Sequence, residues 1–509
     1  MDSRSKNGVR NVFAGFINRI VLIILPFITR TAIVYTLGSE YLGLSNLFTS
    51  ILMVLNLSEL GFGSALVYSM YKPVADNDTA TLKALLNFYK RIYRIVGLGL
   101  LLVGAIVSLF LPKIIKGDVP GDVNLYVLYF MFLANTSISY FVYAHKKALL
   151  IAYQRNDILS NVSTIITIIS YSIQIGVLIL FHNYYLYVLV FLVSTIADNL
   201  YSEYFTRRMY PEIVCEGECT DQEKKAIYKH VKGIALQKLC SSSRNTFSSI
   251  AISMFLGLKS IAIYGNYYYI MSAVHDFLYQ IPNNIRSTVG NSVAKDSQEK
   301  NYKDFNAMCL IYAWITGVCT VCLCCLFQPF MKIWMGEEMM MGMPIVVLLC
   351  LYFTILSFAD ILALYKDAAG LWWQGRYRVI IEAVTNIVLC FTLGKYFGVA
   401  GIIAAPIITL ALISHCYGGY IVFKYYFTEQ NFGIFMARQL LYISIVAFIS
   451  FITYYICDFL PTEGFIDLIS RLFVSLMVSN VLFYIILRHT NHYELAKMFA
   501  VNIYKSMKK

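Results

Sequence analysis

The sequence predicts an all-α polytopic membrane protein with about fourteen transmembrane helices. Of its 509 residues, 59% are hydrophobic and only 14% are charged, and the mean hydropathy is +0.64. Soluble domains are roughly 45–50% apolar. Apolar stretches of about 20 residues, the length that crosses a bilayer, recur along the whole chain. Lysines and arginines gather in alternate connecting segments, as the positive-inside rule requires.

Hydropathy windows give fourteen candidate spans in chain order. They are 12–36, 42–70, 84–111, 123–144, 158–181, 184–206, 232–256, 260–289, 304–330, 342–366, 378–396, 400–426, 434–457 and 464–487. The seventh and eighth, around KGIALQKLCSSSRNTFSS and NYYYIMSAVHDFLYQIPNNIR, are too polar to face lipid. Their polarity suggests that they line a cavity.

The basic residues predict the orientation. With the N-terminus inside, inner segments and adjacent helix ends hold 31 of the 41 lysines and arginines, and the outer loops hold five. Five more lie within spans: Arg19, Arg30, Lys238, Arg244 and Arg471. Both termini are therefore predicted to be cytoplasmic. The net charge of +12 reports this topology rather than nucleic-acid binding, because the basic residues form no single patch.

The N-terminus and the cysteines carry no processing or metal signal. MDSRSKNGVRNVF has no separate short apolar segment with a small-residue cleavage site, so the first helix is expected to be retained. Ten of the twelve cysteines fall in spans, where thiols act as small apolar residues. Cys215 and Cys219 form a CxxxC without an accompanying His, so we expect no metal, cofactor or disulfide framework.

The organisation suggests a duplicated six-helix unit. A shift of 219 residues lays FINRIVLIILPFITRTAIVYTLG over ALQKLCSSSRNTFSSIAISMFLG, pairing Asn18 with Gln237 and Arg19 with Lys238. Two such halves with a substrate site between them are the usual transporter plan. The predicted parts are an N-terminal lobe (1–206), a cytoplasmic linker (207–231), a second lobe (232–427), and two further helices with a cytoplasmic tail (428–509).

Two arginines in the first span are the leading candidate site. Arg19 and Arg30 are eleven residues apart, so they share one helix face about 16 Å apart along the axis, with Pro26 between them. In one interpretation each side chain snorkels to its nearer interface. In the other, they form a cationic cleft with Lys238 and Arg244 that binds a phosphate-bearing group, because guanidinium binds phosphate bidentately.

Acidic and aromatic residues in the spans add further candidates. Carboxylates within spans are either ion-pair partners or sites of proton or ion coupling. They are Glu59, Asp198, Asp276 and Asp360, with Glu203 and Glu382 nearer inner ends and His275 beside Asp276 as a titrating candidate. Tyr267, Tyr268 and Tyr269 either belong to an interfacial aromatic belt or stack against sugar rings.

Four stretches resemble a known family. They are RTAIVYTLGSEYLGLSNLFTSILMVLNLSELGFGSALVYSMYKPVADND (30–78), FLGLKSIAIYGNYYYIM (255–271), QPFMKIWMGEE (328–338) and RYRVIIEAVTNIVLCFTLGKYFGVAGIIAAPIITL (376–410). They are similar to bacterial oligosaccharide-lipid flippases, in the polysaccharide-transporter branch of the multidrug/oligosaccharidyl-lipid/polysaccharide exporter superfamily. The resemblance covers nearly the whole chain, and its motifs are structural rather than catalytic.

The resemblance implies a V-shaped, two-lobed MATE-like bundle of twelve core helices plus two more. Such a protein would be a non-enzyme in the bacterial cytoplasmic membrane, moving an undecaprenyl-diphosphate-linked oligosaccharide for O-antigen, capsule or exopolysaccharide by alternating access. Protons or sodium ions and the glycan polymerase machinery are the implied partners. First-helix arginines of related flippases meet the pyrophosphate, and the matching positions are Arg19 and Arg30. Where relatives often carry another arginine, this chain has Glu59, so Lys238 and Arg244 are expected to take that role.

Other function classes predict different features. A drug-cation antiporter of the same fold should carry acids rather than arginines in its first helix. A glycan polymerase or ligase usually has a large outer loop, whereas the longest predicted ones here are 112–122 and 328–343. The chain contains no GxxxxGK[ST] loop, which disfavours an ATP-driven pump. A channel stays open as an alternative, although polar spans in two matched halves favour alternating access.

Overall fold

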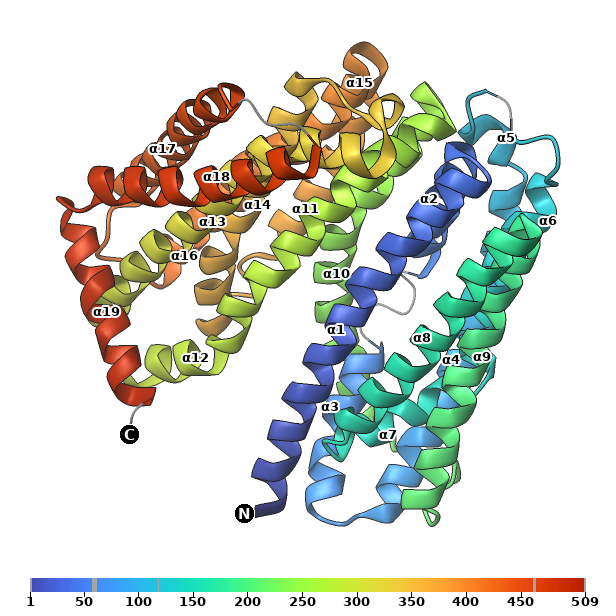
Figure 1. Ribbon diagram of the computed structural model, residues 1–509. Helices are drawn as coiled ribbons and strands as arrows, with labels where there is room; N and C mark the ends of the chain where they lie inside the picture. The colour runs from blue at the N-terminus through green and yellow to red at the C-terminus, as the bar shows by residue number, and fades with distance from the viewer. Residues whose placement is uncertain (1, 57–61, 118, 461–463, 508–509) are drawn as a thin grey trace. The chain divides into compact units, whose positions relative to one another are not determined.

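The structure, a computed structural model, contains two compact units, Met1–Ala262 and Ile263–Lys509. It describes residues 2–56, 62–117, 119–460 and 464–507, without the side chains of 2–17, 62, 64, 226, 229–230, 232–243, 491, 500 and 502–507. Within these ranges every regular element is a helix (Figure 1), which confirms the predicted all-α class.

The first unit is a bundle whose helices pair along their lengths. In it α1 packs along α8, α8 beside α9, α4 beside α6, and α10 beside α2 and α3 (Figure 1). Its elements are α1 (Asp2–Thr36), α2 (Ser39–Leu55), α3 (Phe62–Ala75), α4 (Thr79–Ser108), α5 (Leu111–Ile114), α6 (Leu125–Phe141), the 3₁₀ turn η2 (Ala144–Lys146), α7 (Lys147–Ala152), α8 (Asn156–Phe181), α9 (Tyr184–Met209) and α10 (Asp221–Leu256).

The second unit is built around α13, which packs against α14, α17, α18 and α19. Its elements are α11 (Leu258–Asn284, mostly in this unit), α12 (Arg286–Lys295), α13 (Gln298–Met335), η3 (Glu337–Met339), α14 (Met343–Ala368), α15 (Arg376–Thr409), the π-helical turn η4 (Leu410–Tyr417), α16 (Gly418–Tyr425), α17 (Phe432–Asp458), α18 (Gly464–Leu487) and α19 (Asn491–Met507). A buried cluster that includes Phe358, Val446, Ile449 and Phe483 ties these helices together.

Nine helices of the described residues are long and apolar enough to cross a membrane, or ten if the bent pair of α6 and α7 forms one span. The predicted span 42–70 corresponds to α2 and α3, separated by residues outside the described ranges. Neither α10 nor α11 is among the nine, although both exceed 25 residues. This agrees with the expectation that the seventh and eighth predicted spans are too polar to face lipid.

The continuous helical stretch Arg376–Tyr425 counts as one of these nine helices but corresponds to two predicted spans. Its 50 residues would measure about 75 Å as a straight helix, over twice the thickness of the hydrocarbon core. Gly398 interrupts it with φ +58°, a conformation that glycine adopts readily. A Cβ on Gly401 would lie 2.1 Å from the Leu393 carbonyl oxygen, so the chain folds back on itself here. The turn supports the predicted pair 378–396 and 400–426.

The segment predicted as a linker, 207–231, is mostly helical. α9 continues to Met209, and α10 begins at Asp221 behind a capping box in which Thr220 accepts from the Glu223 amide and Glu223 accepts in return. The contacts of α10 with α2 and α3 place it in the first unit, whereas the proposed second lobe begins at residue 232. The duplication of two lobes therefore stays a prediction.

Candidate substrate-binding surfaces

Arg30 lies partly buried on α1, beside α2. Its Nη1 donates a hydrogen bond to Asn46 Oδ1 at 3.2 Å, across the two helices. Thr29, the preceding residue, is 2% exposed and donates within the helix to the Leu25 carbonyl. The neutral Asn46 amide thus orients one end of the guanidinium, whose forked donors suit a phosphate group.

Arg19 is exposed, one helical position from the contact that attaches α1 to α8. The neighbouring Asn18 donates through Nδ2 to Thr164 Oγ1 at 2.9 Å. Since α1 continues as a helix through Pro26, Arg19 and Arg30 do share a face, and Arg30 is the more buried of the two. The pyrophosphate role of this pair stays a prediction.

The two cations predicted from the seventh span lie on α10. Arg244 is partly buried, and its backbone carbonyl accepts from Ser248 Oγ at 2.8 Å. The side chain of Lys238 lies outside the part of the chain whose side chains are described. Both α1 and α10, which carry the four predicted phosphate ligands, contact α2 within the first unit.

Several of the predicted acids form ion pairs. Asp198 on α9 pairs with Lys147 on α7, and each side chain is about one-quarter exposed. Glu382, which is 1% exposed, accepts from Arg378 Nη1 at 2.8 Å. These two contacts favour the ion-pairing interpretation for Asp198 and Glu382.

Asp360 on α14 is buried and, unlike Asp198 and Glu382, it lies beside a tyrosine and a histidine. Tyr312 donates its hydroxyl to Asp360 Oδ2 at 2.8 Å, and His275 Nε2 lies 3.2 Å from the same oxygen but outside hydrogen-bonding geometry. His275 therefore faces Asp360 rather than its chain neighbour Asp276, which is exposed. Glu59 lies outside the described residues.

The three predicted sugar-stacking tyrosines differ in exposure. Tyr267 is fully buried; its hydroxyl donates to Gln328 Oε1 at 2.9 Å and accepts from the Met341 amide at 3.1 Å. This packing leaves no ring face for a sugar, which corrects the prediction for Tyr267. Tyr268 stacks on Tyr264 with ring centroids 5.7 Å apart. For Tyr268 and Tyr269, both partly buried, the stacking role stays a prediction.

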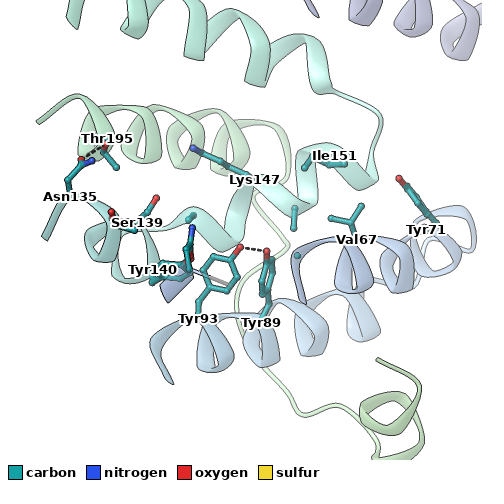
Figure 2. Close-up of a pocket in the computed structure, with 15 residues that line it drawn as sticks. Val67, Tyr71, Tyr89, Tyr93, Asn135, Ser139, Tyr140, Lys147, Ile151 and Thr195 are labelled. Carbon is teal, nitrogen blue, oxygen red and sulfur yellow. Dashed lines mark hydrogen bonds between the residues drawn. The ribbon is translucent and has the colours of Figure 1, made fainter. Parts of the chain in front are cut away.

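A polar pocket of about 690 Å³, which the sequence analysis did not identify, lies within the first unit (Figure 2). Residues from α3, α4, α6, η2, α7 and α9, together with Asn56 just after α2, line it: Asn56, Gly63, Val67, Tyr71, Tyr89, Tyr93, Asn135, Thr136, Ser139, Tyr140, Ala144, Lys147, Ala148, Ile151 and Thr195. The available sequence signal was the run Asn135, Thr136 and Ser139 in an otherwise apolar span. Neutral polar residues carry little weight in hydropathy windows, so that signal was weak.

An apolar groove lies in the second unit, between α11, α13 and α18. Its volume is about 390 Å³, and only apolar side chains and cysteines line it: Ile270, Val274, Val318, Cys319, Cys322, Leu323, Leu326, Phe327, Phe330, Leu468, Leu472 and Leu476. Such a lining accepts a hydrocarbon chain and offers no partner to a polar group.

The loop cysteines have a histidine neighbour that the sequence spacing could not show. Cys215 Sγ lies 3.5 Å from Nε2 of His145, 70 residues away in the chain. Burial raises the pKa of the Cys215 thiol. It also raises the pKa of the Cys219 thiol, to about 11. In the described part of the chain, no three His, Cys, Asp or Glu side chains gather as a metal site.

No family model and no curated protein matches the sequence. Solved structures do match over nearly the whole chain. The lipid II flippase MurJ in its inward closed conformation has a TM-score of 0.66 at 15% identity, covering 94% of this chain and 99% of MurJ. An inward-facing multidrug resistance MATE family transporter of the MOP superfamily has a TM-score of 0.63 at 15% identity, covering 85% and 98%.

A third match is a MOP superfamily transporter from Pyrococcus furiosus, described as having a binding pocket of reverse polarity. Its TM-score is 0.55 at 14% identity, covering 87% of this chain and 96% of that one. The chain is therefore a multi-pass membrane protein with the fold of MOP superfamily transporters.

Proposed function

We propose that this protein is a flippase that moves an undecaprenyl-diphosphate-linked oligosaccharide across the bacterial cytoplasmic membrane by alternating access. Such a cargo is amphiphilic, with a long isoprenoid chain, an anionic diphosphate and a polar glycan. The observation that carries the proposal is the groove between α11, α13 and α18, whose apolar lining suits an isoprenoid chain. Burying each CH₂ group of such a chain contributes about 0.8 kcal/mol.

The diphosphate is assigned to the cations of α1 and α10. Arg19, Arg30, Lys238 and Arg244 are the proposed ligands, and Arg30 is the strongest because its guanidinium is already oriented by Asn46. A forked guanidinium binds phosphate oxygens bidentately, and partial burial strengthens the interaction relative to water. The likeness to MurJ, named as a lipid II flippase, supports this substrate class.

The coupling step is assigned to the second unit. Asp360, His275 and Tyr312 come from three helices and meet at one buried carboxylate. An intramembrane carboxylate beside a histidine is a candidate to accept a proton or a sodium ion during the cycle. The same residues fit the second candidate function, a cation-coupled small-molecule exporter, which the MATE likeness favours.

Mass spectrometry of lipids that copurify with the protein tests the proposal. A flippase should retain a polyprenyl diphosphate carrying sugars, whereas a small-molecule exporter should retain only bulk phospholipid. Finding bulk phospholipid alone, under mild extraction that preserves bound lipid, would contradict the proposal. The termini are proposed to be cytoplasmic, with the glycan polymerase machinery as the consumer of the flipped product.

The groove gives a second arm to this experiment. Leu472 on α18 lines the groove, so Leu472→Trp should fill it and weaken binding of undecaprenyl diphosphate to the purified protein. Excluding two CH₂ groups of the chain costs about 1.6 kcal/mol, more than tenfold in affinity. Ile469→Trp, on the exposed face of the same helix and outside the groove lining, is the matched control.

A further inference from the structure

The polar pocket of the first unit has the lining of a binding site rather than of a packing defect. Four tyrosines, Tyr71, Tyr89, Tyr93 and Tyr140, lie around it together with amide and hydroxyl side chains (Figure 2). Empty packing defects are apolar, whereas this cavity presents hydrogen-bonding groups on every contributing helix. Its volume of about 690 Å³ lies within the roughly 300–1,000 Å³ of small-molecule sites.

The polar groups around the pocket are held in place by one another. Thr195 donates from Oγ1 to Asn135 Oδ1 at 2.8 Å, and Asn199 donates from Nδ2 to Ser139 Oγ at 3.0 Å. These bonds leave the Asn135 amide nitrogen and the Ser139 hydroxyl proton as donors for a ligand. The Tyr140 hydroxyl bonds Asn56 in the same way, and that of Tyr89 bonds Tyr93. The donors and acceptors are thus fixed before a ligand arrives, which lowers the entropy cost of binding.

The charge of the pocket selects against ionic ligands. Lys147 is the one charged side chain among the lining residues, and it pairs with Asp198, so the two charges cancel locally. A phosphate would have to break this pair to gain a cation, and a cationic drug would have to displace Lys147 from the carboxylate. A neutral ligand with many hydroxyl groups needs neither step.

The pocket also lies at a break in a span. Chain direction changes by 50° between α6 and the segment Ala144–Ala152, and Tyr143 at the break adopts φ +51°. Tyr140 precedes the break and Ala144 and Lys147 follow it, and all three line the pocket. Discontinuous transmembrane helices commonly form the binding sites of transporters, because the break exposes polar groups within the membrane.

We propose that this pocket binds a neutral saccharide unit of the transported glycan. The inference rests on the proposed function, which supplies the glycan as cargo, and it adds the site that recognises the sugar. Tyr71, which is 45% exposed, offers its ring to the C–H surface of a pyranose, while the amides and hydroxyls pair with the sugar's hydroxyl groups. The pocket therefore distinguishes a glycosylated lipid from the bare lipid diphosphate.

The test compares two lipids on the purified full-length protein: undecaprenyl diphosphate and undecaprenyl diphosphate bearing one glucose. The wild type should bind the glucosylated lipid more tightly. Asn135→Ala and the nearly isosteric Thr195→Val should each lower that sugar-dependent gain about threefold to tenfold, the worth of one neutral hydrogen bond. Thr392→Val is the matched control, because Thr392 is exposed on α15 and donates to backbone carbonyls of its own helix.

The possible results separate the two proposals. An unchanged sugar-dependent gain in both pocket variants, with bare-lipid binding intact, would overturn the saccharide site and leave the flippase proposal standing. No binding of either lipid by the wild type would overturn the flippase proposal. A glucuronate-bearing lipid that binds more tightly than the glucosylated one, through Lys147, would contradict the assignment to a neutral sugar. Thr195→Val keeps side-chain shape, so it reports on binding even if Asn135→Ala misfolds.

Discussion

At the scale of single residues, the role of a charged side chain depends on which residue it contacts, and its residue type alone does not give that partner. Two acid–base contacts, Arg207 with Glu203 and Arg378 with Glu382, have the four-residue spacing that a sequence displays on a helix. The contact of Lys147 with Asp198 joins residues 51 positions apart, and nothing in the local pattern predicts it. The Cys215–His145 contact could not be predicted for the same reason, because the two residues are 70 positions apart. The sequence identifies such residues as candidates, but it does not predict contacts between residues that are far apart in the chain.

Arg30 gives the residue-scale prediction for the diphosphate. Arg30→Ala should weaken binding of undecaprenyl diphosphate by about 10- to 150-fold, because a charge-assisted contact is worth roughly 1.5–3 kcal/mol. Arg30→Lys should restore only part of the affinity, since an ammonium keeps the charge but lacks the bidentate fork. Arg208→Ala removes an exposed arginine at the end of α9 and serves as the control. Silent results for both Arg30 variants would favour snorkelling.

Asp360 gives the residue-scale prediction for coupling. Asp360→Asn keeps an acceptor for the Tyr312 hydroxyl but cannot gain and lose a charge, so transport should fall while the protein stays folded. Asp276→Asn, at an exposed position on α11, is the companion variant. Transport is measured in proteoliposomes over a range of pH and sodium concentration. Full activity of both variants under every condition would reassign the two acids to structural roles.

At the scale of elements, hydropathy predicts long apolar helices because a span must exclude charge over about 20 residues. Nine helices of the described residues have this length and composition. The residue pattern is less informative about where a helix breaks or bends. The break at Gly398 was anticipated as a boundary between two spans, whereas the bend after α6 was not, because Tyr143 is not a residue type that marks a turn. The polar pocket was missed for a related reason. Its lining comes from helices that are separate in sequence and meet only after folding.

The tight turn of α15 makes an element-scale prediction. Gly401→Ala would place a Cβ about 2.1 Å from the Leu393 carbonyl oxygen, so the backbone must shift. Forced overpacking of this kind costs about 1–3 kcal/mol. The detergent-solubilised variant should therefore lose its monodisperse state at a lower temperature than the wild type. Gly176→Ala in α8, where an added Cβ meets nothing within 4 Å, should show no such loss.

At the scale of the whole molecule, the fold of MOP superfamily transporters agrees with the class that composition and hydropathy predicted. Orientation in the membrane rests on the basic residues alone. In a background without the native thiols, cysteines placed at Lys116 and Glu337 should react with an impermeant reagent added outside, while one at Glu212 should not. All three positions are exposed. Labelling of Glu212→Cys from outside would invert the proposed topology.

The most direct measurement of the central claim is translocation itself. Purified protein is reconstituted into liposomes with a short-chain polyprenyl diphosphate that carries a fluorescent sugar, and a membrane-impermeant quencher reports which leaflet holds it. The flippase account predicts protein-dependent loss of protection from the quencher, slowed by Arg30→Ala and unchanged by Arg208→Ala. The account would be contradicted if the fluorescent sugar lost its protection from the quencher no faster than in empty liposomes, while the protein bound the lipid and exported a small cation.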